Sequence, residues 1–555
     1  MIRRSWYRVL CLLPIFLLLP VWPVFGMDGD HSLPVRTGKT NPHEQTGTGQ
    51  LSPPSGETAP GTWFPGATPP DADLKKPPIV FVQGLNGKAQ SWWSETFYHG
   101  MNDMYETAFN YGYRTAFVQL HDAGGNPATY WENGKLLARM LEEIYRHFGQ
   151  KVNIVAHSKG GLDTQAALVH YGASSYVNKV VTLGSPHYGS HVADLAYSWW
   201  AGWLAELLGL KSDATYSLQT GEMAKFREVT DKHPNTLKNR YYTAAGTNWG
   251  PPLSALWFGG AYLSAHGDND GLVNVWSTRL PYGQHLFTSD VDHDEIRTGT
   301  ASFAKMDSVL STFLAGDLAN PISSPTPSLA AGTRTNHFVR GGPLSAQEAK
   351  TETVPVDGSV DNMIIAVLTK SLQTEVKLVS PSGKVYSEKS RQFSRTNDQV
   401  FFRGAAVQLF QIRDRAESGD WLMQMKSPQT DAYLLVAIFP GKEEVSVSMP
   451  VLTDEKVPIQ IKLNHAQLEP GQIQGTVRVL PPLAGMDGNV HKAEIVSLIR
   501  SRNNPDLSAQ LHLKKPGTYN LTIEIRGVTT DGKPFARTII RSVHVGKINR
   551  QVLVE

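Results

Sequence analysis

The sequence predicts an α/β domain with a mainly parallel sheet covered by helices on both faces, followed by two all-β modules. Between residues 78 and 318, apolar runs rich in β-branched residues alternate with stretches of helical periodicity, which is typical of βαβ units. From residue 333 onward the pattern changes to short alternating strands separated by Gly and Pro turns. A chain of 555 residues is long enough for several such units.

The first 26 residues have the features of a secretory signal peptide. Three arginines precede the apolar run "VLCLLPIFLLLPVWPVF", and the small residue Gly26 follows it. Secretion is therefore expected, and an uncleaved membrane anchor is the alternative. Removing residues 1–26 lowers Lys plus Arg from 52 to 49 against 50 Asp plus Glu, so the mature chain lacks the positive charge typical of nucleic-acid binding. The only cysteine, Cys11, lies in the same segment, so no disulfide is expected in the mature chain.

Two segments of biased composition divide the rest of the chain. Residues 27–77 are rich in Gly, Pro, Thr and Ser, which predicts a disordered linker or a pro-segment. Residues 319–332, "ANPISSPTPSLAAG", predict an interdomain linker. The unit between them, residues 78–318, has the length of one α/β domain.

In this unit the expected elements follow one another in regular order. Each expected strand is a short apolar run, as required for a parallel strand that is covered on both faces. Reactive groups of such sheets gather at the carboxyl ends of the strands. The expected strands are "PIVFVQG", "YRTAFVQL", "KVNIVAHS", "VNKVVTLG", "NRYYTAAGT" and "QHLFTS", and the expected helices cover 92–111, 129–148 and 160–171.

Ser158 stands at the end of the third expected strand, in "VNIVAHSKGGLDT" (152–164). A nucleophilic serine on a sharp strand-to-helix turn leaves little room for side chains two residues before and two residues after it. Those positions hold Ala156 and Gly160. Ser158 is therefore a candidate nucleophile, and a serine in an ordinary βα turn is the alternative.

The segment AHSxGG resembles the nucleophile segment of secreted bacterial lipases and esterases of the α/β-hydrolase superfamily. Three further segments resemble the same group and follow in the same order: "FVQGLNG", "GDNDGLVNVWS" and "VDHDEIRTG". The resemblance implies that Ser158 is the nucleophile, His293 the base and Asp270 the acid that orients this base. It also implies an oxyanion hole formed by the backbone N–H groups of Leu85 and Lys159.

The resemblance leaves competing residues at two positions and departs from the family at one. Gln83 stands where the family usually has the His of an HG pair. Because the oxyanion donors are backbone groups, this change is expected to affect loop orientation more than function. The competing candidates are Asp268 for the triad acid, and His157, His187 and His285 for the base.

Metal binding rests on one residue of the sequence. Glu295 matches a position that helps to bind structural calcium in some related lipases. Gly299, Thr300 and Ala301 stand where a further acid is expected, so a solvated acidic loop is the alternative. No cofactor is expected to be required, and Glu295 is the candidate ligand for a structural calcium ion.

Residues 191–210 predict one helix with a broad apolar face that carries three tryptophans. Such a helix could be a mobile lid that opens at a lipid–water interface, or a cap that is packed permanently on the core. A lid predicts long-chain lipid substrates, and a fixed cap predicts short soluble esters.

The C-terminal part predicts two β-sandwich modules that resemble immunoglobulin-like domains, at 333–445 and 446–555. The pieces "SGDWLMQM" and "PGTYNLTI" repeat a Gly-x-aromatic step into alternation. Neither module shows a catalytic constellation. They could bind substrate or a cell surface, or serve as a structural appendage.

The function favoured by these observations is a secreted serine carboxylic-ester hydrolase, either a triacylglycerol lipase or an esterase, acting on ester or lipid substrates. A polyester depolymerase would share the same machinery. The alternative from another class is a surface-binding protein on an inactive hydrolase fold, and the intact Ser158, Asp270 and His293 argue against it.

Overall fold

The structure is a computed structural model. It describes residues 59–208, 211–314, 333–398, 402–413, 415–440, 445–464, 468–482, 493–500 and 506–547, and the strand 36–37. The predicted signal peptide (1–26) and interdomain linker (319–332) lie outside the described residues. Within the described ranges, no helix is both long enough and apolar enough to cross a membrane.

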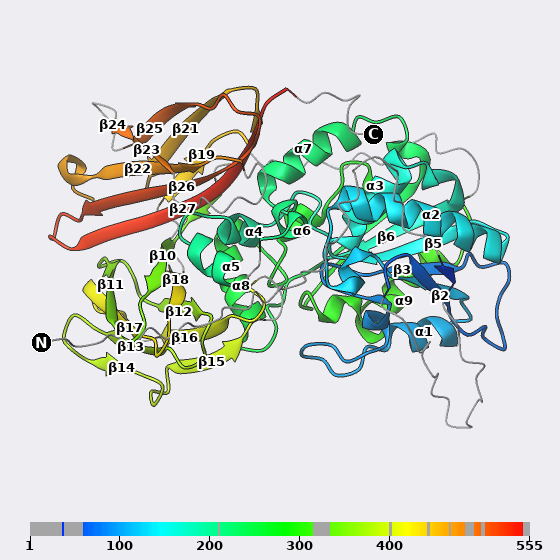
Figure 1. Cartoon of the computed structure of the whole chain (residues 1–555), viewed down its shortest axis with the longest axis horizontal. Helices are drawn as coiled ribbons and strands as arrows, with labels where there is room; N and C mark the ends of the chain where they lie inside the picture. Colours follow the sequence, from blue (N-terminus) through cyan, green and yellow to red (C-terminus); the bar gives the residue numbers. More distant parts are fainter. Residues whose placement is uncertain are drawn as a thin grey trace, which may run out of the picture. The chain divides into compact units, whose positions relative to one another are not determined.

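The α/β part is built on one eight-stranded sheet with the order β1-β2-β4-β3-β5-β6-β7-β8 (Figure 1). Strands β3 to β8 are parallel to one another, whereas β2 pairs antiparallel with β4. Every residue of β3 to β6 is buried, as expected of strands covered on both faces, and the predicted fold class is confirmed. The strands are β1 Arg36–Thr37, β2 Thr62–Pro65, β3 Ile79–Val82, β4 Thr115–Val118, β5 Val152–His157, β6 Val177–Leu183, β7 Arg240–Gly246 and β8 Gly283–Ser289.

Helices cover both faces of this sheet (Figure 1). Helices α2 (Tyr130–Phe148) and α3 (Gly160–His170) share a core with one face of β3 and β5. Helices α1 (Met104–Asn110) and α9 (Gly299–Leu310) share a second core with the other face. The other α-helices are α4 His191–Ala196, α5 Gly202–Leu207, α6 Asp213–Tyr216, α7 Thr220–Thr230 and α8 Ala255–Leu263.

Helix α2 coincides with the helix predicted at 129–148, and its ends show why the prediction works. Thr129 accepts the N–H of Glu132, and the Glu132 side chain accepts the N–H of Thr129, which together form a capping box. The helix ends at Gly149, which adopts the left-handed conformation with φ 67°.

The helix predicted at 92–111 is wrong over most of its length, because only its last part, α1, is helical. The preceding residues form a loop that is held by a contact from a distant part of the chain. Asp294 Oδ2 accepts the N–H groups of Phe97 (2.6 Å) and Tyr98 (3.3 Å). These tertiary hydrogen bonds replace the local ones on which helical periodicity relies.

The segment predicted over 27–77 as a disordered linker or a pro-segment is ordered in its last part, residues 59–77. This part contains β2, in which Trp63 and Phe64 are buried. Trp63 Nε1 also donates a hydrogen bond to Glu143 (3.2 Å). Two adjacent aromatic side chains provide enough apolar surface to add a strand to the sheet.

The C-terminal part consists of four β-sheets that enclose two cores. The sheets β10-β18-β12-β16-β15 and β11-β17-β13-β14 share one core, and β24-β25-β21-β19-β9 and β20-β27-β26-β22-β23 share the other. Strand β9, at the start of the range predicted for the first module, pairs with β19 in the second pair of sheets. The strands are β9 Thr333–Thr335, β10 His337–Leu344, β11 Ala349–Val356, β12 Met363–Thr369, β13 Glu375–Val379, β14 Val385–Tyr386, β15 Phe393–Asn397, β16 Ala406–Ile412, β17 Gly419–Lys426, β18 Asp431–Ile438, β19 Val445–Ser448, β20 Leu452–Thr453, β21 Lys456–Leu463, β22 Gln474–Leu480, β23 Glu494–Ser497, β24 Ile499–Arg500, β25 Leu507–His512, β26 Gly517–Val528 and β27 Pro534–Val545.

The single helix predicted at 191–210 is wrong, because α4 and α5 are separate helices. Near the break, the carbonyl oxygen of Trp200 lies so close to Gly341 of β10 that a Cβ at Gly341 would come within 1.9 Å of it. Helices α4 and α5 pack against β10, β18 and β27. The apolar surface that predicted a lid or a cap is therefore covered by the β modules.

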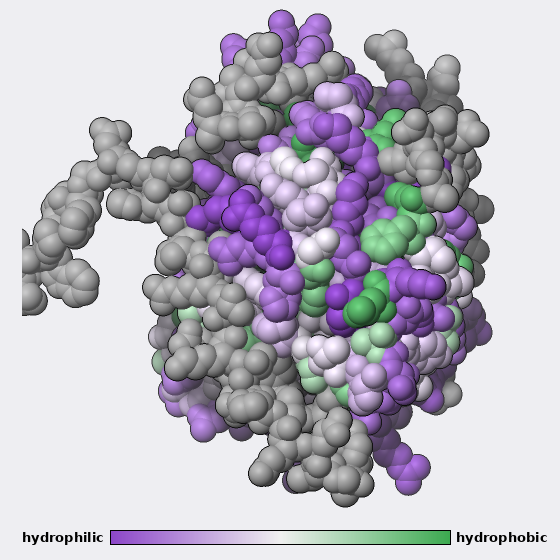
Figure 2. Space-filling model, turned by 90° about the vertical axis from the view of Figure 1, so that its right-hand side faces the viewer, coloured by the Kyte–Doolittle hydropathy of each residue, from purple (hydrophilic) through white to green (hydrophobic). Residues whose placement is uncertain are grey.

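Figure 2 shows one face of the molecule, where hydrophobic residues form small groups among hydrophilic ones. Two large apolar side chains that are exposed lie on the loop that precedes α1: Phe97 (55% exposed) and Met101 (67%). Phe97 also borders the cavity at Ser158. The rim of this cavity therefore offers apolar surface to an incoming molecule.

Candidate active site

Ser158 lies in the turn between β5 and α3, as its sequence motif predicts. Its φ is 54°, in the left-handed region that few non-glycine residues adopt. Two glycines make room for this turn: Gly160 at its end and Gly84 in the loop that follows β3. A Cβ at Gly160 would lie 2.3 Å from the Gln83 carbonyl oxygen, and a Cβ at Gly84 would lie 2.8 Å from Ser158 Cβ. The strained turn presents the hydroxyl at the carboxyl edge of the sheet.

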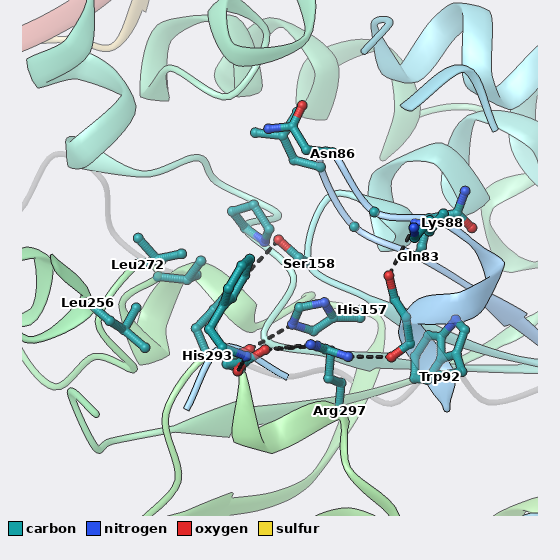
Figure 3. A pocket seen from close by; sticks show the side chains of 18 of the residues that line it. Gln83, Asn86, Lys88, Trp92, His157, Ser158, Leu256, Leu272, His293 and Arg297 are labelled. Atoms are coloured by element: carbon teal, nitrogen blue, oxygen red, sulfur yellow. Dashed lines mark hydrogen bonds and ion pairs between the residues drawn. The ribbon is translucent and has the colours of Figure 1, made fainter. Parts of the chain in front are cut away.

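The structure brings Ser158, His293 and Asp270 together, although they come from three different loops. Ser158 Oγ lies 3.0 Å from His293 Nε2 (Figure 3). His293 Nδ1 lies 2.8 Å from Asp270 Oδ2. The other oxygen of Asp270 accepts the N–H groups of Leu272 (3.1 Å) and Val273 (2.8 Å), which fixes the plane of the carboxylate. The arrangement can accept a proton from the serine and stabilise the resulting imidazolium.

The environment of His293 favours its charged form. Burial alone lowers the pKa of the His293 imidazole. The negative charges of Asp270, Asp292 and Asp294 raise it and together outweigh burial, so the pKa lies above the ordinary 6.5. His157 lies beside it, with Nε2 2.8 Å from the His293 carbonyl oxygen. Burial lowers the pKa of His157 well below 6.5, so this imidazole is neutral and supports the His293 loop.

The proposed oxyanion donors, the N–H groups of Leu85 and Lys159, have no hydrogen-bond partner among the described residues. The side chain of Gln83 holds the loop that carries Leu85. With its amide oriented to satisfy both partners, Gln83 donates to the Val118 carbonyl and accepts the N–H of Leu120, both at 2.9 Å. Gln83 therefore fixes this loop from a buried position, where the family usually has a His.

A cavity of about 270 Å³ opens beside Ser158. Figure 3 shows Leu256 and Leu272 on one side of the Ser158–His293 pair and Trp92 on the other. Apolar side chains make up the larger part of the lining surface, and polar and charged side chains, among them Glu95 and Arg297, lie between them. None of the described residues of α4 and α5 lines this cavity, whereas Arg403 of the first β module does.

Asp268, His187 and His285 lie outside this arrangement, whereas His157 lines the cavity beside His293. Asp268 is exposed, whereas Asp270 is completely buried. His187 Nε2 lies 3.2 Å from Thr182 Oγ1, and His285 contacts two threonines in the same way. Neither of these two imidazoles lines the cavity.

One group among the described residues could hold a metal ion. His99, Asp292 and Glu295 place one possible ligand atom each within 4.8 Å of one another. Calcium prefers six to eight oxygen ligands, and one imidazole with two carboxylates suits a transition metal better. Calcium binding through Glu295 stays a prediction.

The sequence did not indicate Asp122, Asn133 or Arg403 as residues near the site. Asp122 follows the carboxyl end of β4, and its position there is a signal that could have been used. Asn133 and Arg403 come from a helix and from another module, and no local pattern places them.

Comparisons with known proteins identify the family of this chain. The model of the class 2 lipase family matches residues 76–197. The propeptide form of lipase BlEst2 from Bacillus licheniformis is 36% identical with a TM-score of 0.72, and the match covers 88% of this chain and 99% of that one. The mature form of the same lipase is 50% identical with a TM-score of 0.42, and the match covers 46% of this chain and 99% of that one. The chain therefore belongs to the bacterial lipases and esterases of the α/β-hydrolase superfamily and is a lipase- or esterase-type hydrolase.

Proposed function

We propose that this chain hydrolyses carboxylic esters through a Ser158–His293–Asp270 triad and an acyl-enzyme. The observation that carries the proposal is the unbroken line of contacts from Ser158 Oγ to His293 and on to Asp270. The strained turn at Ser158 supports the same conclusion, and so do the N–H groups of Leu85 and Lys159, which have no hydrogen-bond partner among the described residues.

The reaction follows from these contacts. His293 takes the proton of Ser158 as the hydroxyl oxygen attacks the ester carbonyl, and Asp270 stabilises the imidazolium. The N–H groups of Leu85 and Lys159 bind the oxyanion, and each such donor typically stabilises the transition state by about 3–4 kcal/mol. His293 then protonates the leaving alcohol. Water attacks the acyl-enzyme with His293 again as base, which releases the acid and restores Ser158.

The volume of the cavity indicates the length of the acyl group that the site prefers. At about 270 Å³ it is close to the small end of ligand sites, and its apolar wall includes Leu256 and Leu272. We infer that the intact chain prefers esters with short acyl groups. The basic and apolar segment at 1–26 supports export of the protein.

We also propose that the β modules act as a propeptide. The similar BlEst2 structure is described as a propeptide form, and the similarity includes the modules. In this chain the modules cover α4 and α5 and bring Arg403 to the edge of the cavity. Their removal would expose apolar surface and widen access to Ser158.

Hydrolysis of p-nitrophenyl esters from acetate to palmitate tests the function. We expect the intact chain to hydrolyse the short esters fastest, and limited proteolysis that removes the modules to extend activity to longer ones. Ser158→Ala should abolish both activities. Activity that persists in Ser158→Ala would overturn the proposed nucleophile, and equal rates on acetate and palmitate by the intact chain would overturn the size argument.

A further inference from the structure

A buried polar cluster lies behind the oxyanion hole. Lys159 Nζ lies 3.0 Å from Asp163 Oδ1 and 3.5 Å from Asp122 Oδ2. Asn133 donates to Asp122 Oδ2 (2.6 Å) and to Asp163 Oδ2 (3.2 Å). All four side chains are buried, with at most 4% exposed. Ionised groups are costly to bury, so a cluster of this kind calls for a role beyond stability.

The carboxylates of Asp122 and Asp163 differ in whether they also contact the loop that carries Leu85. Asp122 Oδ1 accepts the N–H of Asn86 (3.1 Å), the residue that directly follows Leu85. Asn86 has φ 57°, a conformation that persists only where its surroundings hold it. Asp163 makes no hydrogen bond to this loop in the described part of the chain.

We propose that Asp122 is a positioning residue that fixes the two donors of the oxyanion hole relative to each other. One oxygen of its carboxylate holds the loop that carries Leu85. The other holds the ammonium of Lys159, whose backbone N–H is the second donor. This inference rests on the proposed function. Asp122 acts through these two residues and touches neither the substrate nor the reacting atoms.

The spacing of the donors matters because preorganised dipoles stabilise the oxyanion only where they meet the developing charge. A misplacement of about 1 Å can cost about a hundredfold in rate. The Asp122 carboxylate contacts both segments that carry a donor, and this bridge prevents such a misplacement. It also explains why a lysine side chain is completely buried directly after the nucleophile.

Asp163 provides a matched control. Burial raises the pKa of the Asp163 carboxyl to about 7, although Lys159 opposes this effect. This shift favours the uncharged form of Asp163, which Asp163→Asn resembles. Asp122→Asn makes the same chemical change in the same cluster. Its amide oxygen is expected to face the donors Lys159 and Asn133, which leaves an NH₂ group against the N–H of Asn86.

The test compares kcat, KM and inhibition by butylboronic acid, which forms a tetrahedral adduct with the serine and places an oxygen in the hole. Asp122→Asn should lower kcat by about 10–100-fold and keep KM within about threefold of the wild-type value. It should also lower the affinity for butylboronic acid by about the same factor as kcat. Asp163→Asn should stay within about threefold of the wild type on all three readouts. If Asp122→Asn does not fold, Lys159→Met, which keeps the backbone donor, should show the same selective loss of kcat and boronate affinity.

Equal losses in Asp122→Asn and Asp163→Asn would show that the cluster serves stability alone and would overturn the proposal. Unchanged kcat and boronate affinity in folded Asp122→Asn would do the same. Failure of the proposed function is distinguishable from both, because it would appear as an active Ser158→Ala variant or as an inactive wild type.

Discussion

Asp270→Asn is expected to lower kcat by about 10⁴-fold and to leave KM nearly unchanged. The amide would keep the volume of Asp270 and one acceptor for the loop N–H groups, but it cannot stabilise the imidazolium at His293. It would also favour the wrong tautomer of the imidazole, with the proton on the nitrogen that must accept it from Ser158. Steady-state kinetics on a short p-nitrophenyl ester measures the effect.

The matched control for this prediction is Asp268→Asn. It makes the same chemical change two residues away, at an exposed carboxylate that does not contact His293. Its kcat should remain within about threefold of the wild type, as expected of a surface substitution. A large loss in Asp268→Asn together with an active Asp270→Asn would reverse the assignment of the triad acid.

Acid is expected to destabilise the packing of the β modules on the hydrolase domain. Three buried imidazoles meet there. The His191 and His266 ring centroids lie 4.1 Å apart, and His337 of β10 stacks on Tyr262 at 4.4 Å. Neither ring nitrogen of His266 has a hydrogen-bond partner among the described residues. The charged groups that act on this cluster are Arg541, Arg537 at His337 and, through His191, Asp194.

The pKa of each imidazole is lowered, first by burial and then by neighbouring cations, and that of His337 falls to about 3. A histidine with a lowered pKa contributes stability that is present above its ordinary 6.5 and is lost as the pH falls toward the lowered value. At about pH 4.5, two units below 6.5, the lowered pKa of His337 alone reduces the free energy of unfolding by about 3 kcal/mol. The urea midpoint of the intact chain should therefore fall steeply between neutral and acid pH.

His337→Phe is the control, because phenylalanine keeps the stack on Tyr262 and cannot be protonated. This variant should lose clearly less stability than the wild type over the same pH range. Identical pH dependence in the two proteins would contradict the role of His337.

The sequence predicts most of the fold because the deciding signals are local. The strands β3 to β6 are short, mostly apolar and buried throughout, and α2 has a capping box at one end and a glycine at the other. Short motifs in the sequence indicated Ser158, Asp270 and His293. In the structure, His293 lies within hydrogen-bond distance of both Ser158 and Asp270.

The errors arise where a distant part of the chain decides the local structure. The loop before α1 is held by Asp294, and the segment of α4 and α5 is broken where Trp200 meets Gly341. The role proposed for Asp122 depends on contacts with Asn86 and Lys159, which lie 36 and 37 residues away in the sequence. A periodic pattern carries no information on such contacts, since it reports only which face of an element is apolar.

Labelling with a p-nitrophenyl alkylphosphonate tests the central claim most directly, because an activated serine attacks phosphorus, releases p-nitrophenol and keeps the phosphonyl group. Peptide mass spectrometry should find one adduct, on Ser158, that appears in parallel with the loss of esterase activity and is absent from Ser158→Ala. An enzyme that is inactivated while Ser158 stays unmodified would show that another residue is the nucleophile.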